Sequence, residues 1–204
     1  MTTIEHALLG TNLVLATGLE KKFGWQSVAL GGVCAVLPDW DGLTILWSVS
    51  LFDDAHRVWG HNLLVCLIVA LFIAVLDYRH DIITRTARRL TQWTKFAAPD
   101  DRLAVRTVFS CSGLAFWFFV AIFATCSHLV SDMVFSGTAT LSDWDLKPFW
   151  PFSDRGVVYP LISWGDVGVT IIFILGMFAM LRWKNKTALV ARLTLLAVLG
   201  YIAL

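Results

Sequence analysis

Seven apolar runs divide this chain of 204 residues, at about 7–19, 25–37, 43–52, 62–77, 104–126, 166–183 and 187–204. A helix that crosses a bilayer needs about 20 apolar residues, with a lower limit near 17. Only 15% of the residues are charged, whereas an ordinary soluble domain carries about 25%. The runs therefore exclude a soluble protein and predict an integral membrane protein.

We predict an all-α fold with about six transmembrane helices, built as a single membrane domain over residues 1–204. The run at 43–52 lies between Asp41 and Asp53 and is too short to cross, so we expect a short re-entrant or interfacial helix there. The first 19 residues lack the basic region and the cleavage pattern of a signal peptide, and we expect them to stay in the fold. The four cysteines lie inside apolar runs without CxxC spacing, which favours buried thiols over disulfides.

The basic residues indicate the orientation, because short cytoplasmic loops accumulate Lys and Arg. Thirteen of the sixteen fall in three connections, at 21–22, 78–106 and 182–192. With six alternating crossings these connections share one side, which we assign to the cytoplasm, with a basic loop at about 78–106. An outer loop at about 128–165 and both termini then face the periplasm.

The outer side is acidic and rich in histidine. It holds ten of the fifteen Asp and Glu residues and four of the five histidines, but only Arg57, Lys147 and Arg155 among the basic residues. The net charge of +1 is thus the sum of two faces of opposite sign. A nearly neutral chain has no overall field for nucleic acid, so we expect no nucleic-acid partner.

Three short motifs and one further histidine supply candidate metal ligands on this side. The motifs are Pro38-Asp39-Trp40-Asp41, His56-Arg57-Val58-Trp59-Gly60-His61-Asn62 and His128-Leu129-Val130-Ser131-Asp132. Carboxylates and imidazoles at the membrane boundary are costly unless they are paired, solvated or bound to a cation. The predicted ligands are His6, Asp39, His56, His61, His128 and Asp132, with Asp166 as a possible additional one. His80 lies in the basic loop and is excluded.

Each motif also has a simpler interpretation. Asp-x-Asp is equally typical of a helix stop followed by an N-cap. The second motif is also consistent with one interfacial histidine beside an arginine that extends toward the headgroups. A His/Asp pair four residues apart on a helix is often a local hydrogen bond, and an Asp at a helix start such as Asp166 is usually a cap.

Histidine with carboxylate suits zinc, manganese or iron. We expect a divalent metal, zinc first, and the number of candidate ligands leaves room for two ions. We predict that Asp41 acts as the general base and that Arg57 is catalytic. Arg57, Asn62, Lys147 and Arg155 are the predicted substrate contacts, because cations isolated among carboxylates suit an anionic substrate group.

The order of these motifs resembles the membrane-bound metal-dependent hydrolase family, also called the YdjM-like family. The resemblance runs from His6 to about Asp166 and rests most on the HRxxxH element that follows PDxD. Where the family usually has HRGxTHS, this chain has Val58, Gly60 and Asn62 in place of glycine, threonine and serine. The resemblance implies a bacterial inner-membrane protein and a metal-dependent hydrolase.

The leading hypothesis is a hydrolase that acts at the outer leaflet on a lipid-linked ester or phosphoester, with membrane lipid or a lipid-linked molecule as its partner. The loop at 136–165 is then a lid over the site or an amphipathic connector. The alternative is a non-enzymatic protein, either a divalent-metal or proton-coupled transporter or a membrane partner subunit. The oligomeric state, the substrate and the scissile bond stay open.

Overall fold

The structure is a computed structural model that describes residues 1–94, 109–136 and 145–204. All regular secondary structure in these residues is helical, apart from one antiparallel bridge between Leu146 and Val157. The elements are α1 (Thr3–Thr17), α2 (Glu20–Phe23), α3 (Trp25–Val36), the 3-10 helix η1 (Leu37–Leu46), α4 (Val49–Ala55), α5 (Leu63–His80), α6 (Ile82–Thr94), α7 (Cys111–Val134), α8 (Val167–Arg182), the 3-10 helix η3 (Lys184–Lys186) and α9 (Thr187–Ile202). The predicted all-α class is confirmed.

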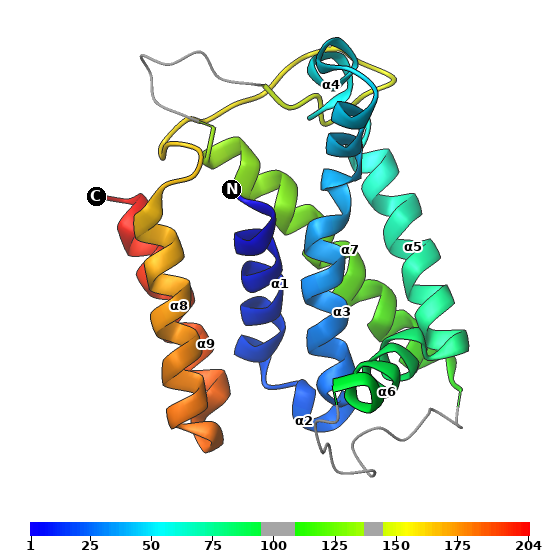
Figure 1. The fold of residues 1–204 in the computed structure, drawn as a ribbon, viewed down its shortest axis with the longest axis vertical. Helices are drawn as coiled ribbons and strands as arrows, with labels where there is room; N and C mark the ends of the chain where they lie inside the picture. The colour runs from blue at the N-terminus through cyan, green and yellow to red at the C-terminus, as the bar shows by residue number, and fades with distance from the viewer. Residues whose placement is uncertain (95–108, 137–144) are drawn as a thin grey trace.

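The long helices run alternately down and up between two ends of the molecule (Figure 1). We call the end with α4 and both chain termini the acidic end. The opposite end, with α2, α6 and η3, is the basic end. Helices α1, α3, α5 and α7 surround the main apolar core, while α8 and α9 pack beside α1 around a second, smaller core.

Four helical segments of the described chain are long and apolar enough to cross a membrane. They are Trp25–Leu46, Leu63–His80, Cys111–Val134 and Lys184–Ile202. Helix α8 is apolar but has 16 residues, and α1 has 15. The spanning helices are thus confirmed, but the count of six crossings is not, because α1 and α8 fall short of a full span.

The run at 43–52 does not form one helix, which corrects the expected boundary. Its first half ends η1, which continues α3 directly. The run breaks at Trp47 and Ser48, and the Ser48 side chain accepts a hydrogen bond from the Leu51 amide and caps α4. A short helix is therefore present, but it starts at Val49.

Helices α1 and α3 are in very close contact through glycine. A Cβ atom on Gly10 would lie 2.3 Å from the Gly31 carbonyl oxygen, and one on Gly31 would lie 2.6 Å from Cγ2 of Val14. Small residues let helix backbones approach in this way inside membranes. The contact holds the first turn of α1 beside η1, which matters for the site described below.

The segment from 145 to 166 crosses the acidic end (Figure 1). The Leu63 amide donates to the Pro148 carbonyl at 3.0 Å, and the Tyr159 amide donates to that of Met133 at 2.8 Å. Residues 137–144 of the predicted lid, and 95–108 of the predicted basic loop, lie outside the described residues. All four cysteines are free thiols, as expected. Cys34 and Cys66 are buried, but Cys126 is partly buried and Cys111 is exposed, so the expected burial holds for two of the four.

Candidate metal centre

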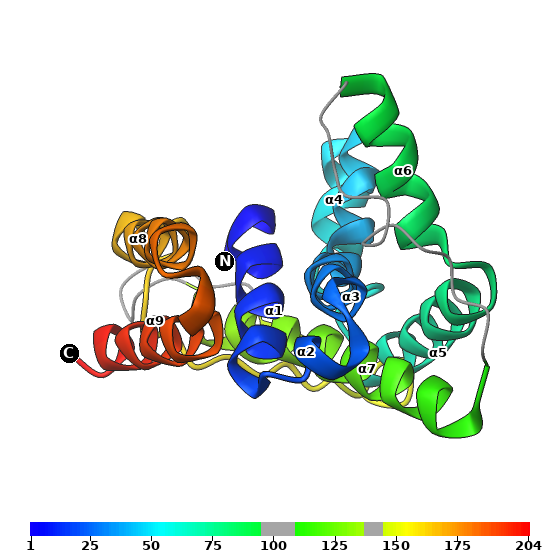
Figure 2. The same cartoon turned by 90° about the horizontal axis from the view of Figure 1, so that it is seen from below.

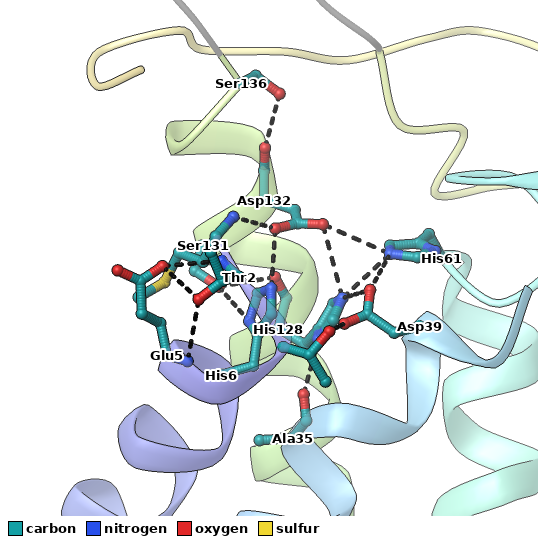
Figure 3. A network of polar contacts seen from close by, with 12 residues as sticks. Thr2, Glu5, His6, Ala35, Asp39, His61, His128, Ser131, Asp132 and Ser136 are labelled. Carbon is teal, nitrogen blue, oxygen red and sulfur yellow. Dashed lines mark hydrogen bonds and ion pairs between the residues drawn. The ribbon is translucent and has the colours of Figure 1, made fainter. Parts of the chain in front are cut away.

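Histidines and carboxylates from four segments meet at the acidic end (Figure 3). His6 lies in the first turns of α1, where Thr2 and Glu5 form a reciprocal capping box. Asp39 lies in η1, and His61 lies in the connection before α5. His128 and Asp132 are one turn apart on α7. These segments are far apart in sequence, and the helix packing brings their side chains to one point.

The facing atoms are Nε2 of the histidines and the carboxylate oxygens. His6 Nε2 lies 3.0 Å from Asp132 Oδ1. His128 Nε2 lies 3.4 Å from Asp39 Oδ1 and 3.6 Å from Asp132 Oδ2. His61 Nε2 lies 3.6 Å from Asp39 Oδ1 and 3.4 Å from Asp132 Oδ2. We call these five residues the central cluster.

The ring nitrogens of His61 and His128 face each other at 3.0 Å. The Nδ1 atom of His128 lies 2.7 Å from the Ala35 carbonyl, and Nδ1 of His61 lies 2.9 Å from Asp41 Oδ2. Both partners are acceptors, so each Nδ1 carries a hydrogen and each Nε2 is left to face the cluster. Two such nitrogens at this distance require a shared proton or a shared cation.

His6 completes the cluster from the side. Its ring stacks on that of His128, with centroids 3.6 Å apart, and its Nδ1 lies 3.2 Å from the Ser131 hydroxyl. His6 is fully buried, and within the described part of the chain its Nε2 has no hydrogen-bond partner, although it lies 3.0 Å from Asp132 Oδ1. A buried polar atom without a partner is costly unless something else binds it.

The carboxylates around His61 also favour a cation in the cluster. Burial alone disfavours the charged ring, but Asp132, Asp39 and Asp41 outweigh burial and raise the pKa of His61 well above its usual value. Two buried carboxylates, Asp41 and Asp132, together with the partly buried Asp39, thus favour positive charge at this place. A divalent cation satisfies the same demand.

Asp41 lies behind the central cluster and is completely buried. Its Oδ1 lies 2.9 Å from His56 Nδ1, and its Oδ2 accepts from the Gly60 amide at 2.8 Å as well as facing His61. Both oxygens are therefore engaged. This geometry is typical of a carboxylate that orients ligand histidines, which differs from the general base that we predicted.

Arg57 lies beside the cluster in an unusual backbone conformation, with a φ of 63°. Its guanidinium donates to the Ser136 hydroxyl and lies 3.8 Å from Asp132 Oδ2. Left-handed backbone at a residue other than glycine is uncommon and is often found at functional sites. The turn directs a buried arginine toward the carboxylates instead of toward solvent.

A cleft of about 360 Å³ opens onto the cluster. The residues that line it include Thr3, Asp39, His56, Arg57, Asp132 and Trp164. The cleft therefore reaches two of the cluster's carboxylates and the arginine from outside. His56 belongs to this wall, with 16% of its side chain exposed.

Two predicted site residues, Asn62 and Asp166, form hydrogen bonds that cap helices. The Asn62 side chain caps α5 by accepting from the Val65 amide, and its Nδ2 donates to the carbonyls of Val58 and Trp59. Its amide is thus fully used within its own turn. Asp166 caps α8 by accepting from the Gly168 amide at 2.8 Å, and it also accepts from the Tyr201 hydroxyl.

Lys147 and Arg155 are not among the residues that line the cleft. Lys147 lies 4.0 Å from Asp154, and the Arg155 side chain is exposed. The structure therefore does not bring these two predicted substrate contacts to the cluster. Of the basic residues predicted on this face, Arg57 is the one at the cleft.

The central cluster fits a metal ion. It offers imidazole nitrogen and carboxylate oxygen, the donors that zinc, manganese and iron accept. It also includes the buried Nε2 atom of His6, which accepts or donates no hydrogen bond among the described residues. The donor atoms of His6, Asp39, His128 and Asp132 lie within 4.8 Å of one another. Asp41, His56 and His61 form a second close group, but there the two Asp41 oxygens already face the Nδ1 atoms of His56 and His61 at 2.9 Å. The geometry favours one ion in the central cluster.

Three contacts of the central cluster could not be predicted from the sequence. They come from the Met1 amino group, which lies 2.8 Å from Asp132 Oδ1, the Ala35 carbonyl and the Ser131 hydroxyl. The first two are main-chain groups, and any residue type supplies them. Ser131 lies within the predicted motif that contains His128 and Asp132, but its contact with His6 depends on the position of α1.

The sequence profile of the YdjM inner membrane protein family matches this chain over residues 1–204. The chain belongs to this family. The resemblance drawn from the motifs is thereby confirmed, and the family's description agrees with the membrane-length helices of the fold. Searches of curated proteins and of solved structures gave no match.

Proposed function

We propose that this chain is a metal-dependent hydrolase of the bacterial inner membrane, acting at the outer leaflet on a lipid-linked ester or phosphoester. The observation that carries the proposal is the convergence of three histidines and two carboxylates beneath a cleft that Arg57 lines. A site of this composition on an apolar helical bundle suits a substrate that is itself held in the membrane.

The central cluster is the proposed metal site, with zinc as the first candidate and manganese or iron as alternatives. A divalent cation bound there lowers the pKa of water and polarises an ester or phosphoryl oxygen. Ala35 and Asp41 hold the rings of His128 and His61, so that their Nε2 atoms keep their direction. Such outer contacts commonly set metal affinity.

Arg57 is the proposed contact for the anionic part of the substrate. A guanidinium binds phosphate or carboxylate through two parallel hydrogen bonds. Arg57 is held by Ser136 and by Asp132, and it lines the cleft directly beside the metal ligands. An anionic ester group bound to it would have its reacting bond near the cluster.

His56 is the proposed proton carrier, and Asp41 is the carboxylate that orients it. His56 lines the cleft, and its Nδ1 lies 2.9 Å from Asp41 Oδ1. A carboxylate behind an imidazole fixes the ring and stabilises its charged form, as in hydrolase triads. We therefore expect His56 to exchange the proton, while Asp41 holds both His56 and His61.

Six crossings with the acidic end outside are part of the proposal. Helix α1 has 15 residues and spans about 22 Å, which is less than the ~30 Å hydrocarbon core. We expect the first turn of α1, with His6, to lie at headgroup depth on the periplasmic side. This depth suits a reaction on a lipid headgroup.

Transport of a metal or of protons is the second class considered. Against it, the core between α1, α3, α5 and α7 consists largely of apolar side chains. Asp77, a buried carboxylate near the basic end, is held by Trp117 Nε1 and by the Ile83 amide, each at 2.8 Å. The described residues thus offer no chain of ionisable groups between the two ends.

The test is hydrolysis of a detergent-solubilised bacterial lipid extract by the metal-loaded protein, followed by mass spectrometry. We expect loss of particular lipids with the wild type and with Arg155→Gln, an exposed arginine away from the cleft. Arg57→Gln should reduce turnover by about 100-fold or more and keep its bound metal. A metal-loaded wild type that hydrolyses nothing in the extract, but carries metal into vesicles, would refute the hydrolase in favour of the transporter.

A further inference from the structure

Helix α6 lies across the basic end of the molecule. Figure 1 shows it nearly end-on beside the lower end of α5, and Figure 2 shows it lengthwise, projecting away from the bundle. Its axis is therefore roughly perpendicular to the direction in which α3 and α5 run. A helix in this position lies parallel to a membrane that α3 and α5 cross.

The two faces of α6 differ sharply in chemistry. At 100° per residue, Ile82, Ile83, Ala87, Leu90 and Trp93 share one side. Arg85 and Arg88 lie on the opposite side, and Arg89 lies at the border of the apolar side, next to Ile82. Leu90 is 55% exposed and Trp93 is 82% exposed. We call the first set the apolar face of α6.

The described contacts hold α6 by its first turn. The Asp77 carboxylate accepts from the Ile83 amide at 2.8 Å, and the Thr84 hydroxyl donates to Asp81 at 3.1 Å. Thr84 also accepts a hydrogen bond from Gln26 on α3, at 3.4 Å. These contacts fix the direction of α6 and leave the later part of its apolar face exposed.

We propose that α6 is an interfacial helix that binds the surface of a bilayer containing anionic lipids, in the leaflet at the basic end. Leu90 and Trp93 enter the boundary between headgroups and acyl chains, the depth that indole rings prefer. Arg85, Arg88 and Arg89 remain at the phosphates. The proposal is independent of the proposed function.

Charge complementarity indicates that the partner of α6 is an anionic lipid surface. The α6 sequence holds three arginines and no acidic residue, and Arg182, Lys184 and Lys186 lie at the same end of the molecule. Basic residues close to a membrane surface are attracted by anionic headgroups, and an amphipathic helix adds burial of its apolar face. A neutral protein partner would not need this arginine face.

The experiment measures how deeply single positions of α6 lie. Nitroxide labels are placed at Leu90→Cys and Trp93→Cys, with Gln92→Cys on the arginine side as the matched control. The background carries Cys111→Ser and Cys126→Ser, because Cys34 and Cys66 are buried. The full chain is reconstituted in vesicles of phosphatidylcholine, with or without phosphatidylglycerol, and collision with oxygen and with a water-soluble nickel complex is compared.

We expect labels at 90 and 93 to collide severalfold more with oxygen than with nickel, and the label at 92 to show the reverse. Replacing Arg85, Arg88 and Arg89 together by Gln should weaken docking of α6 in the anionic vesicles, by about fivefold for each arginine, and should change little in phosphatidylcholine. Equal nickel access at 90, 92 and 93 would overturn the proposal. So would shielding of 90 and 93 from both reagents, since a second protein copy would then cover the face. If replacing the three arginines does not change the docking of α6, the proposed role of anionic lipids is wrong.

Discussion

Asp41 is the residue whose role the structure changes most. Its carboxylate faces His56 and His61 and also accepts from the Gly60 amide. A carboxylate that orients a ligand histidine acts on metal affinity through that histidine. Its effect should therefore differ from that of a residue in the central cluster.

Asp41→Asn tests this positioning role. We expect metal affinity to fall by about 10- to 100-fold, while the protein still binds one ion per chain when metal is in excess. The measurement is competition with a fluorescent chelator. Asp132→Asn serves as the contrast, because its carboxylate faces three histidines and the variant should not reach full occupancy. Equal behaviour of the two variants would count against the distinction.

The residues of the proposed metal site were predictable from the sequence, but their contacts were not. Histidines and aspartates that fall on one leaflet can be recognised once the basic loops define the topology. The direction of each ring depends on partners such as the Ala35 carbonyl, which carries no residue-specific signal. The cap formed by Asn62 could not be predicted for a similar reason, since a helix cap and a substrate contact use the same side-chain amide.

At the scale of elements, the contact between α1 and α3 decides whether the cluster forms. His6 belongs to α1, whereas Asp39 belongs to η1, the direct continuation of α3. Gly10 and Gly31 allow the two backbones to approach. A larger residue at this contact would push the two helices apart, and His6 would then move away from Asp39.

Gly31→Ala should therefore destabilise the protein and weaken metal binding together. The added Cβ would meet Val14 and the Gly10 carbonyl, at 2.6 and 3.0 Å, and overpacking of this kind costs about 1–3 kcal/mol. Thermal unfolding in detergent and metal titration measure the two effects. Gly200→Ala is the matched control, because a Cβ atom at this position would meet no described atom within 4 Å. If Gly31→Ala leaves both stability and metal affinity unchanged, the contact accommodates a methyl group and this prediction is wrong.

The length of the apolar runs predicted most helices. The prediction failed where a run contained a break or was too short to span the membrane. The run at 43–52 joins the end of η1 to the start of α4, and the break lies at Ser48, whose hydroxyl caps the new helix. A serine within an apolar run gives a weak signal on its own. Hydropathy also could not show that α1 is shorter than a full span but is held in place by α3.

At the scale of the whole molecule, the two ends carry opposite charge. The acidic end holds the cluster, and the basic end holds α6 and η3. The distribution of Lys and Arg predicted this polarity, because one topology places most of them on a single side. The chain belongs to a family of inner membrane proteins. Its orientation in that membrane stays a prediction, which the next experiment tests.

Fusions to alkaline phosphatase, which is active only outside the cytoplasm, test that orientation. We expect activity for a fusion after Leu204 and none for a fusion at Asn185, in the turn between α8 and α9. Assays of each fusion in intact cells, normalised to its expression level, give the result. Activity at Asn185 with none at the C-terminus would invert the topology and place the cluster on the cytoplasmic side.

Metal content of the purified protein is the most direct test of the central cluster. The protein is purified in detergent without added chelator and analysed by inductively coupled plasma mass spectrometry, together with His128→Ala and His80→Ala. We predict about one divalent ion per chain in the wild type and in His80→Ala, whose histidine lies at the basic end, and little or none in His128→Ala. A wild type without stoichiometric metal, even after loading, or a His128→Ala variant that retains all of it, would contradict the account.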